Sequence, residues 1–409
     1  MVKKISDRSV ITSRLLGLSS FCRTQFLLPV LFLFYKENGL SDGDFFLFKA
    51  IFSFVGLLFE IPSGYIADIF PKKNVLILSF ALLLSQTLLW LCFQGYLIIL
   101  IGEILVSISR SFYSVASHSY LYEYLKANNK SEKMLQRYGN MNFYLSLGSA
   151  LTSLLGATFY NVVGVKFLLS IDLVLMSGAI VLLLFLPQVA VSYKRINGLG
   201  HFNIVKEKYI ELLTVVRMTM RNKKINSYLW FSGVLGAFTL VFAFCFQTVM
   251  KVSATPVPVF GIVYFVNHII RALTGMLLPK ISKKLSLEKT GFFAYILFCL
   301  SFVLLILAYY IKNFVVTLIF LLIVCAIIGV QLAYLLLVNV YVHAKTLARV
   351  RATVLSVGSM ILRGSAAIIL FFFKLFLNNY TLDIPLFVFG VLFFLTFFTF
   401  RKKLFVQQV

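Results

Sequence analysis

Four arginines interrupt long apolar stretches of this sequence, and they raise the first question about its chemistry. They are Arg23, Arg110, Arg271 and Arg363. An arginine keeps its charge at physiological pH and presents a planar fork of N–H donors that matches carboxylate and phosphate oxygens. Because a charge in apolar surroundings is costly without a partner, these residues indicate the binding of an anion.

Each arginine belongs to a row of polar residues with helical spacing. The longest row is Glu103, Ser107, Arg110, Ser114 and Ser117. The shorter rows are Asn267, Arg271 and Thr274; Ser356, Ser359 and Arg363; and Ser19, Ser20 and Arg23. Residues at such spacings share one face of a helix, so we expect these faces to point into the protein interior. The candidate ligand-binding residues are Arg23, Arg110, Asn267, Arg271 and Arg363.

Composition predicts the kind of element that carries these rows. Apolar residues make up 60% of the 409 positions and charged residues 13%, with a mean hydropathy of +0.95. Ordinary soluble domains are far less apolar. The apolar runs have about the 20-residue length of a membrane-spanning helix, and they lack the alternation of a barrel strand. The sequence therefore predicts an all-α integral membrane protein.

Twelve membrane spans are predicted along the chain. They cover residues 11–35, 44–66, 74–94, 96–122, 138–160, 164–186, 226–250, 257–279, 290–311, 314–341, 352–376 and 384–400. We expect the first span to be retained, because it is too long for a signal peptide and no small-residue cleavage site follows it.

Basic residues are distributed unevenly between the two sides of the predicted membrane. With the N-terminus in the cytoplasm, 28 of the 38 Lys and Arg residues are cytoplasmic, 5 lie at the outer ends of spans and 5 lie within spans. This asymmetry follows the positive-inside rule. It predicts a multi-pass protein of the cytoplasmic membrane with both termini in the cytoplasm. The basic surface is expected to contact anionic lipid headgroups rather than nucleic acid.

A basic segment without the apolar pattern divides the spans into two halves. This segment covers residues 187–225 and starts at Pro187. We expect residues 1–186 and 226–409 to form two six-helix bundles joined by a cytoplasmic linker. Apolar residues within the linker recur at spacings of four and three, which predicts an amphipathic helix on the membrane surface.

The two halves share a short internal repeat. The stretch GYIADIFPKK, with Gly64, Lys72 and Lys73, is matched in the second half by GMLLPKISKK, with Gly275, 211 residues further on. Each stretch closes the second span of its half. The repeat therefore favours a duplicated six-helix unit.

Several motifs give the chain a specific resemblance to a known family. Gly64, Asp68, Lys72 and Lys73 fit the loop between helices 2 and 3 of the major facilitator superfamily, although Pro71 replaces its usual glycine. FEIPSG resembles the Glu-Ile-Pro-Thr-Gly signature of a subgroup of these permeases. GEILVSISRSFYSVASHSYLYEYL resembles their fourth helix, and LVNVYVHAKTLARVRATVLSV resembles their passage from helix 10 into helix 11. The resemblance extends over essentially the whole chain.

The resemblance implies a fold and a mechanism. The family has twelve helices in two pseudo-symmetric bundles that rock around a central cavity, which implies secondary active transport of a small molecule by alternating access. The four arginines lie on helices that line this cavity in the family. The resemblance also assigns a gating role to Gly64, Asp68, Lys72 and Lys73, with Asp68 near the start of helix 11.

Embedded acids provide candidates for proton coupling. Glu60 and Glu103 lie inside spans, where acidic residues often form proton relays in transporters. Alternatively, Glu60 pairs with Arg110, and Glu103 or Asp172 neutralises another arginine. Five embedded cations, counting Lys49, outnumber these three acids. Part of the positive charge is therefore left for an anionic substrate.

The sequence leaves alternatives open for the direction of transport and for the class of protein. Analogy with the family favours proton-coupled efflux, and the alternative is uptake of an organic acid or a metal chelate. A membrane-embedded enzyme or a non-transporting receptor on the same fold is the competing class. The sequence contains no Walker loop, no HExxH motif and no paired cysteine spacing. We therefore expect no enzyme, cofactor or metal site, and we expect a monomer in contact with membrane lipids.

Overall fold

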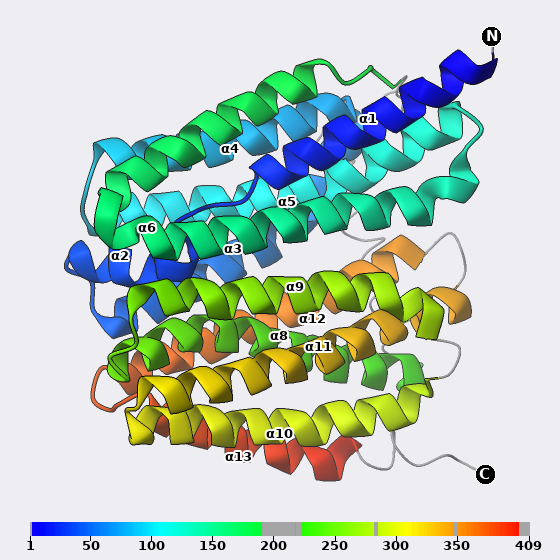
Figure 1. Cartoon of the computed structure of the whole chain (residues 1–409). Helices are drawn as coiled ribbons and strands as arrows, with labels where there is room; N and C mark the ends of the chain where they lie inside the picture. Colours follow the sequence, from blue (N-terminus) through cyan, green and yellow to red (C-terminus); the bar gives the residue numbers. More distant parts are fainter. Residues whose placement is uncertain (1, 190–216, 218–221, 282–284, 347–350, 401–409) are drawn as a thin grey trace.

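The computed structural model describes residues 2–189, 217, 222–281, 285–346 and 351–400. All regular structure in these ranges is helical. The helices run roughly side by side, with α1 to α6 on one side of the molecule and α8 to α13 on the other (Figure 1). We call these groups the N-bundle and the C-bundle.

The N-bundle contains the helices that precede the predicted linker. They are α1 (Val2–Cys22), a 3-10 turn η1 (Leu28–Val30), α2 (Leu31–Glu37), α3 (Asp42–Ile69), α4 (Lys72–Cys92), α5 (Tyr96–Ala127), a 3-10 turn η2 (Ser131–Lys133) and α6 (Met134–Leu184).

The C-bundle contains the helices that follow the linker. They are α8 (Lys223–Val252), α9 (Val257–Ile281), α10 (Leu287–Ile311), α11 (Phe314–Lys345), α12 (Arg351–Leu377) and α13 (Asp383–Phe400). Because α8 begins at Lys223, the bundle starts slightly before the predicted residue 226. The amphipathic linker helix falls largely outside the described residues and stays a prediction.

The helices give the twelve predicted spans. In the described part of the chain, nine helices are long and apolar enough to cross a membrane, and α1 and α13 contain shorter apolar segments. One of the nine, α6, holds two spans because the chain leaves helical geometry at Gly164, where φ is +75° and ψ is 167°. A positive φ of this kind is readily adopted by glycine, which has no Cβ. The all-α fold with twelve spans is thereby confirmed.

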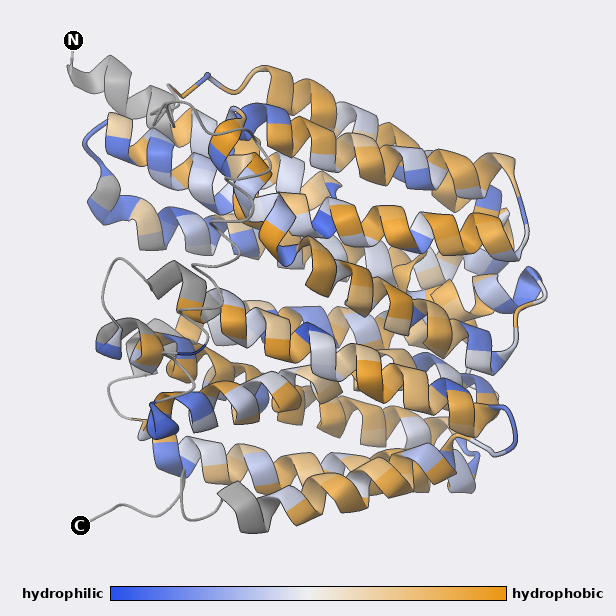
Figure 2. Ribbon diagram, turned by 180° about the vertical axis from the view of Figure 1, so that it is seen from behind, coloured by the Kyte–Doolittle hydropathy of each residue, from blue (hydrophilic) through white to orange (hydrophobic). Residues whose placement is uncertain are grey.

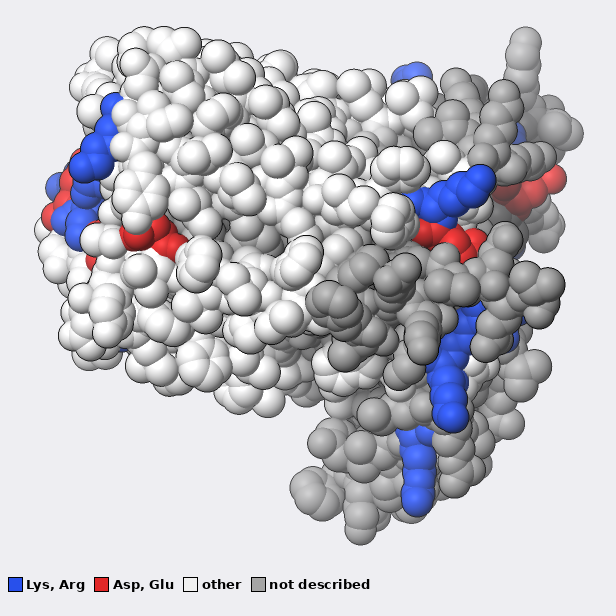
Figure 3. Space-filling view, turned by 90° about the horizontal axis from the view of Figure 1, so that it is seen from below, with Lys and Arg blue, Asp and Glu red and all other residues white. Residues whose placement is uncertain are grey.

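The distribution of polar and apolar residues along the helices agrees with membrane-spanning helices. Hydrophilic residues gather at the two ends of the helices, and apolar residues cover most of the middle (Figure 2). Charged side chains are likewise concentrated at the two ends of the face shown in Figure 3. At one end α1 begins and α13 ends. The opposite end, which we call the distal end, contains the connections at residues 38–41, 253–256 and 378–382.

The first span is broken, whereas the sequence predicted one helix over 11–35. Helix α1 ends at Cys22, and helical structure resumes with η1 at Leu28. Pro29 explains the break, because proline lacks an N–H and its ring clashes with the carbonyl four residues earlier. The freed N–H of Phe26 donates to both carboxylate oxygens of Asp172, at 3.0 and 3.2 Å. Such a break is tolerated in a membrane when protein groups satisfy the backbone.

Small residues allow the helices around this break to approach closely. The two bundles touch along α6 and α9 and along α3 and α12. A Cβ on Gly261 of α9 would lie 2.7 Å from the carbonyl oxygen of Ser153 in α6. A Cβ on Gly156, also in α6, would overlap the carbonyl oxygen of Phe26 at the break. The broken segment therefore packs directly against the α6 backbone.

Gly156→Ala is expected to lower the stability of the protein. The added methyl group collides with backbone that cannot rotate away, and overpacking of this kind costs about 1–3 kcal/mol. Gly178→Ala in the same helix is the matched control, because nothing lies within 4 Å of its Cβ position. Alanine should stabilise that position by up to about 1 kcal/mol. Thermal unfolding in detergent distinguishes the two, and equal melting temperatures would contradict the close packing.

Candidate functional site

Arginines from both bundles converge between the bundles. Arg110 of α5 and Arg271 of α9 both keep accessible side-chain surface. Glu103 attracts Arg110 electrostatically, and the two C-bundle arginines, Arg363 and Arg271, repel it. The Arg110 guanidinium also lies 5.3 Å from the centre of the Phe52 ring. Three of the four predicted arginines thus lie near enough for charge repulsion to act, with Arg110 of the N-bundle repelled by both C-bundle arginines.

The polar row on α5 contains both buried and exposed residues. Glu103 and Ser107 are buried, and the Ser107 hydroxyl donates to the carbonyl of Phe52 in α3 at 2.6 Å. Arg110 and Ser114 are exposed. Ser117, the last residue of the row, is buried again. The predicted face is therefore buried at both of its ends and accessible at Arg110 and Ser114 between them.

Arg23 lies just beyond the end of α1, at the break in the first span. Its Nη2 donates to Ser109 Oγ at 3.0 Å, and its guanidinium lies 4.4 Å from the centre of the Tyr113 ring. Its Nη1 is buried without a hydrogen-bond partner in the described structure. This open donor could bind an acceptor on a ligand.

Arg363 reaches from α12 into the N-bundle. Its Nε lies 3.4 Å from Glu60 Oε2, and its Nη1 lies 3.4 Å from Ser111 Oγ. A Cβ on Gly56 would collide with this guanidinium, so the glycine provides the space that the arginine occupies. Glu60 therefore pairs with Arg363 and not with Arg110, the partner considered from the sequence. The pair joins the two bundles.

Helix α9 contributes two polar side chains that each have one buried atom without a hydrogen-bond partner in the described structure. Asn267 is buried and its Oδ1 accepts no hydrogen bond in the described structure, and the neighbouring His268 has an unpartnered Nε2. The His268 ring lies within the electrostatic field of Arg271 and Arg110. These unsatisfied atoms mark α9 as a second wall of the site, because buried polar atoms are rarely left unpaired.

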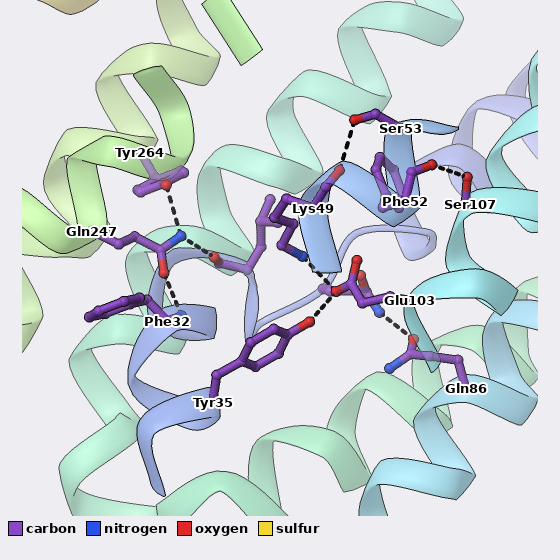
Figure 4. Close-up of polar contacts among 12 residues, drawn as sticks. Phe32, Tyr35, Lys49, Phe52, Ser53, Gln86, Glu103, Ser107, Gln247 and Tyr264 are labelled. Carbon is purple, nitrogen blue, oxygen red and sulfur yellow. Dashed lines mark hydrogen bonds and ion pairs between the residues drawn. The ribbon is translucent and has the colours of Figure 1, made fainter. Parts of the chain in front are cut away.

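A buried ion pair lies deeper in the N-bundle, and its lysine is absent from the predicted site. Lys49 Nζ lies 2.5 Å from Glu103 Oε1, which also accepts the Tyr35 hydroxyl (Figure 4). The rings of Tyr35, Phe45, Phe52 and Phe244 lie 5.4–5.9 Å from the ammonium nitrogen. Phe244 comes from α8, so the C-bundle helps to cover this pair. The sequence signal for Lys49 was its position inside an apolar run.

The predicted gating motif occupies the connection between α3 and α4. Lys72 Nζ lies 3.5 Å from Glu123 Oε1 of α5, and Lys73 Nζ donates to the carbonyls of Leu184 and Leu186 at 2.6 and 2.7 Å. A cation favours the carbonyl end of a helix, here the end of α6. The side chains at 351–353 are outside the described part of the chain, so the contact of Asp68 with α12 stays a prediction. Outside its own helix, Gly64 has no described atom within 4 Å of its Cβ position.

The embedded acids are engaged, and much of the positive charge is not neutralised. Glu103 is paired with Lys49, Glu60 with Arg363, and Asp172 with the Phe26 backbone. Among the described residues, no carboxylate lies within ion-pair distance of Arg23, Arg110 or Arg271; these residues also contain no cluster of His, Cys, Asp and Glu suited to a metal. The site is therefore a group of cationic side chains contributed by both bundles.

Twelve spans in two bundles around a polar interior define a multi-pass membrane transporter. The family model described as Major Facilitator Superfamily matches residues 15–370. The chain belongs to this superfamily, whose members include secondary transporters.

Solved structures share the fold at low sequence identity. A single-residue mutant of the nucleoside transporter NupG has a TM-score of 0.76 and 14% identity, covering 97% of this chain and 99% of that one. A POT family transporter in complex with a thioalcohol-conjugated peptide has a TM-score of 0.70 and 14% identity, covering 98% of this chain and 96% of that one. A POT family transporter in complex with 5-aminolevulinic acid has a TM-score of 0.71 and 14% identity, also covering 98% of this chain and 96% of that one. No curated protein matches the sequence.

Lys49→Met is expected to destabilise the protein strongly. The substitution leaves Glu103 buried without its countercharge, and breaking a buried pair in this way costs about 3–5 kcal/mol. Lys36→Met is the matched control, because the Lys36–Asp42 pair is partly exposed and such pairs contribute about 0–1 kcal/mol. Chemical unfolding of the purified protein compares the two variants.

The double variant Lys49→Met/Glu103→Gln checks the cause. It should recover part of the lost stability because it removes the uncompensated carboxylate. If the double variant is less stable than Lys49→Met alone, the loss comes from packing around the lysine and not from charge.

Proposed function

We propose that this protein transports a small organic anion across the cytoplasmic membrane by alternating access, driven by protons. The observation that carries the proposal is the charge imbalance of the site. Arg110 and Arg271 come from opposite bundles and repel each other electrostatically; both keep accessible surface, and neither has a carboxylate within ion-pair distance in the described structure. An anion bound between them would relieve their repulsion and join the bundles.

The chemistry of the cations supports an anion over a neutral solute. Arginine is not neutralised by proton loss, so the positive charge of the site persists at any physiological pH. A carboxylate or phosphate can accept two parallel N–H bonds from one guanidinium. Arg23 and Asn267 add an unpartnered donor and an unpartnered acceptor. A carboxylate-bearing or phosphate-bearing solute with a further polar group fits this set.

The Glu60–Arg363 pair supports coupling to protons. When Glu60 is ionised it occupies Arg363, and when Glu60 is protonated it releases the guanidinium for a bound anion. Proton and anion then favour each other's binding, as linkage requires. They would move in the same direction, so an inward proton gradient would drive uptake. Efflux, expected by family analogy, is the second candidate, and it requires the two to compete.

Arg110→Lys and Arg271→Lys are expected to weaken anion binding. Lysine keeps the charge but loses the fork, which should cost about 1–3 kcal/mol, or roughly 5- to 150-fold in Kd. Arg14→Lys on the exposed face of α1 is the matched control and should bind as the wild type does. Calorimetry with a panel of carboxylates, phosphate esters and lipophilic cations measures the effect. Binding of lipophilic cations alone, unaffected by Arg110→Lys, would refute an anionic substrate.

Glu60→Gln is expected to uncouple transport from protons. Glutamine resembles the protonated acid, so Arg363 stays available and substrate exchange down its own gradient continues. Accumulation driven by a pH gradient should be lost. Proteoliposomes with and without a pH gradient separate the two activities, and Glu132→Gln on the exposed η2 turn is the control. Unchanged proton-driven accumulation would move the coupling proton to Glu103, His118 or His268.

A further inference from the structure

A glutamine of the C-bundle enters the break in the first span. Gln247 of α8 accepts the backbone N–H of Phe32 on its Oε1 at 2.7 Å, and its Nε2 donates to the carbonyl of Leu28 at 3.1 Å (Figure 4). Gln247 is 1% exposed. One side chain from one bundle thus satisfies both a donor and an acceptor in the main chain of the other.

The two backbone groups are natural partners of each other. In an α-helix the N–H of a residue donates to the carbonyl four positions earlier, so Phe32 N–H would donate to Leu28 C=O. The Gln247 carboxamide lies between these two groups. It replaces the one helical hydrogen bond with two hydrogen bonds, one to Phe32 N–H and one to Leu28 C=O. A side chain inserted into the helical ladder interrupts the helix. Accordingly, residues 28–30 form a 3-10 turn, and Val30 has φ −116° and ψ 14°.

The orientation of the amide is fixed by its own bundle. Gln247 Nε2 also donates to the Tyr264 hydroxyl of α9 at 2.9 Å, and that hydroxyl donates to the carbonyl of Ala243. A flipped amide would place a donor against the Phe32 N–H. The C-bundle therefore presents the acceptor to Phe32 and the donor to Leu28.

Gln247 belongs to a set of contacts that join the bundles at the distal end. The Lys251 ammonium lies 5.3 Å from the centre of the Phe32 ring, and Lys374 Nζ lies 3.8 Å from Asp44 Oδ1. The Phe45 and Phe244 rings lie 5.9 Å apart. A cavity of about 310 Å³, lined by residues of both bundles such as Asp42 and Tyr380, also lies at this end. The distal end is closed in this structure, with the Gln247 bonds inside the closure.

We propose that Gln247 is a latch that exchanges partners with the first span. When the bundles separate at the distal end, Gln247 withdraws and Phe32 N–H bonds directly to Leu28 C=O. The segment from Leu28 to Glu37 then becomes one helix, with Pro29 in its first turn, where a missing N–H costs nothing. No backbone group is left unpaired in an apolar surrounding. The inference rests on the movement of two bundles that the proposed function requires.

Gln247→Met tests the latch, because methionine has a similar volume and makes no comparable hydrogen bond. Spin labels at Phe93 and Tyr380, both exposed at the distal end and in opposite bundles, report the separation once the five natural cysteines are replaced by alanine. We expect the open-to-closed ratio to rise roughly 5- to 30-fold, the factor that corresponds to about 1–2 kcal/mol. If Gln247→Met fails to fold, Gln247→Asn is used, because its shorter amide cannot reach both backbone groups.

Gln331→Met is the matched control. Gln331 is as buried as Gln247, but it bonds Thr239 within the C-bundle. Its replacement should leave the distal distance unchanged. An unaltered distance in Gln247→Met, or an equal shift in both variants, would overturn the latch.

Hydrogen exchange at the Phe32 amide tests the exchange of partners. In the open Gln247→Met protein this amide should stay protected, because Leu28 C=O replaces Gln247. Rapid exchange there would show that the helix does not re-form and would overturn the proposal. Both measurements are made without substrate. A failure of anion binding would therefore refute the proposed substrate and leave the result for the latch standing.

Discussion

Polar groups in the apolar interior of this protein need partners from the protein itself, and the positions of those partners organise the rest of the structure. Glu103 neutralises Lys49, and Glu60 neutralises Arg363. Asp172 is engaged by the backbone at the break in the first span. After these pairings, positive charge remains where the two bundles face each other. The same requirement that stabilises each bundle therefore leaves the unneutralised charge on which the proposed anion binding rests.

The contacts between the bundles differ in kind along the molecule. At the distal end, ring contacts, the buried hydrogen bonds of Gln247 and the partly exposed Lys374–Asp44 ion pair join the bundles. Nearer the middle, the ion pair between Glu60 and Arg363 crosses the boundary, and Arg110 is within the electrostatic range of Arg363. Buried contacts favour tight closure, whereas the Glu60–Arg363 pair is partly exposed. The proposed coupling of protons and anion depends on this second kind of contact.

The sequence selected candidate residues for the site but not their pairings. The helical spacing of polar residues selected Arg110, Arg271 and Arg363, and the structure brings these three together. The sequence contained no signal that connects Glu60 with Arg363 or that distinguishes Gln247 from other polar residues in the spans. A single glutamine in an apolar span has no periodic pattern in the sequence. The role of Gln247 depends on its hydrogen bonds to two backbone groups in the opposite bundle.

By itself the sequence determined the membrane class, the twelve spans and the family, because hydropathy and helical periodicity are properties of neighbouring residues. The break at Pro29 was also encoded locally, although the length of the apolar run concealed it. Only the tertiary structure decided which charge meets which partner and where the bundles touch. Those choices depend on distances between helices that lie far apart in the chain. In an apolar interior, an atom placed within hydrogen-bond reach is a partner, and the same atom a few ångströms away is not.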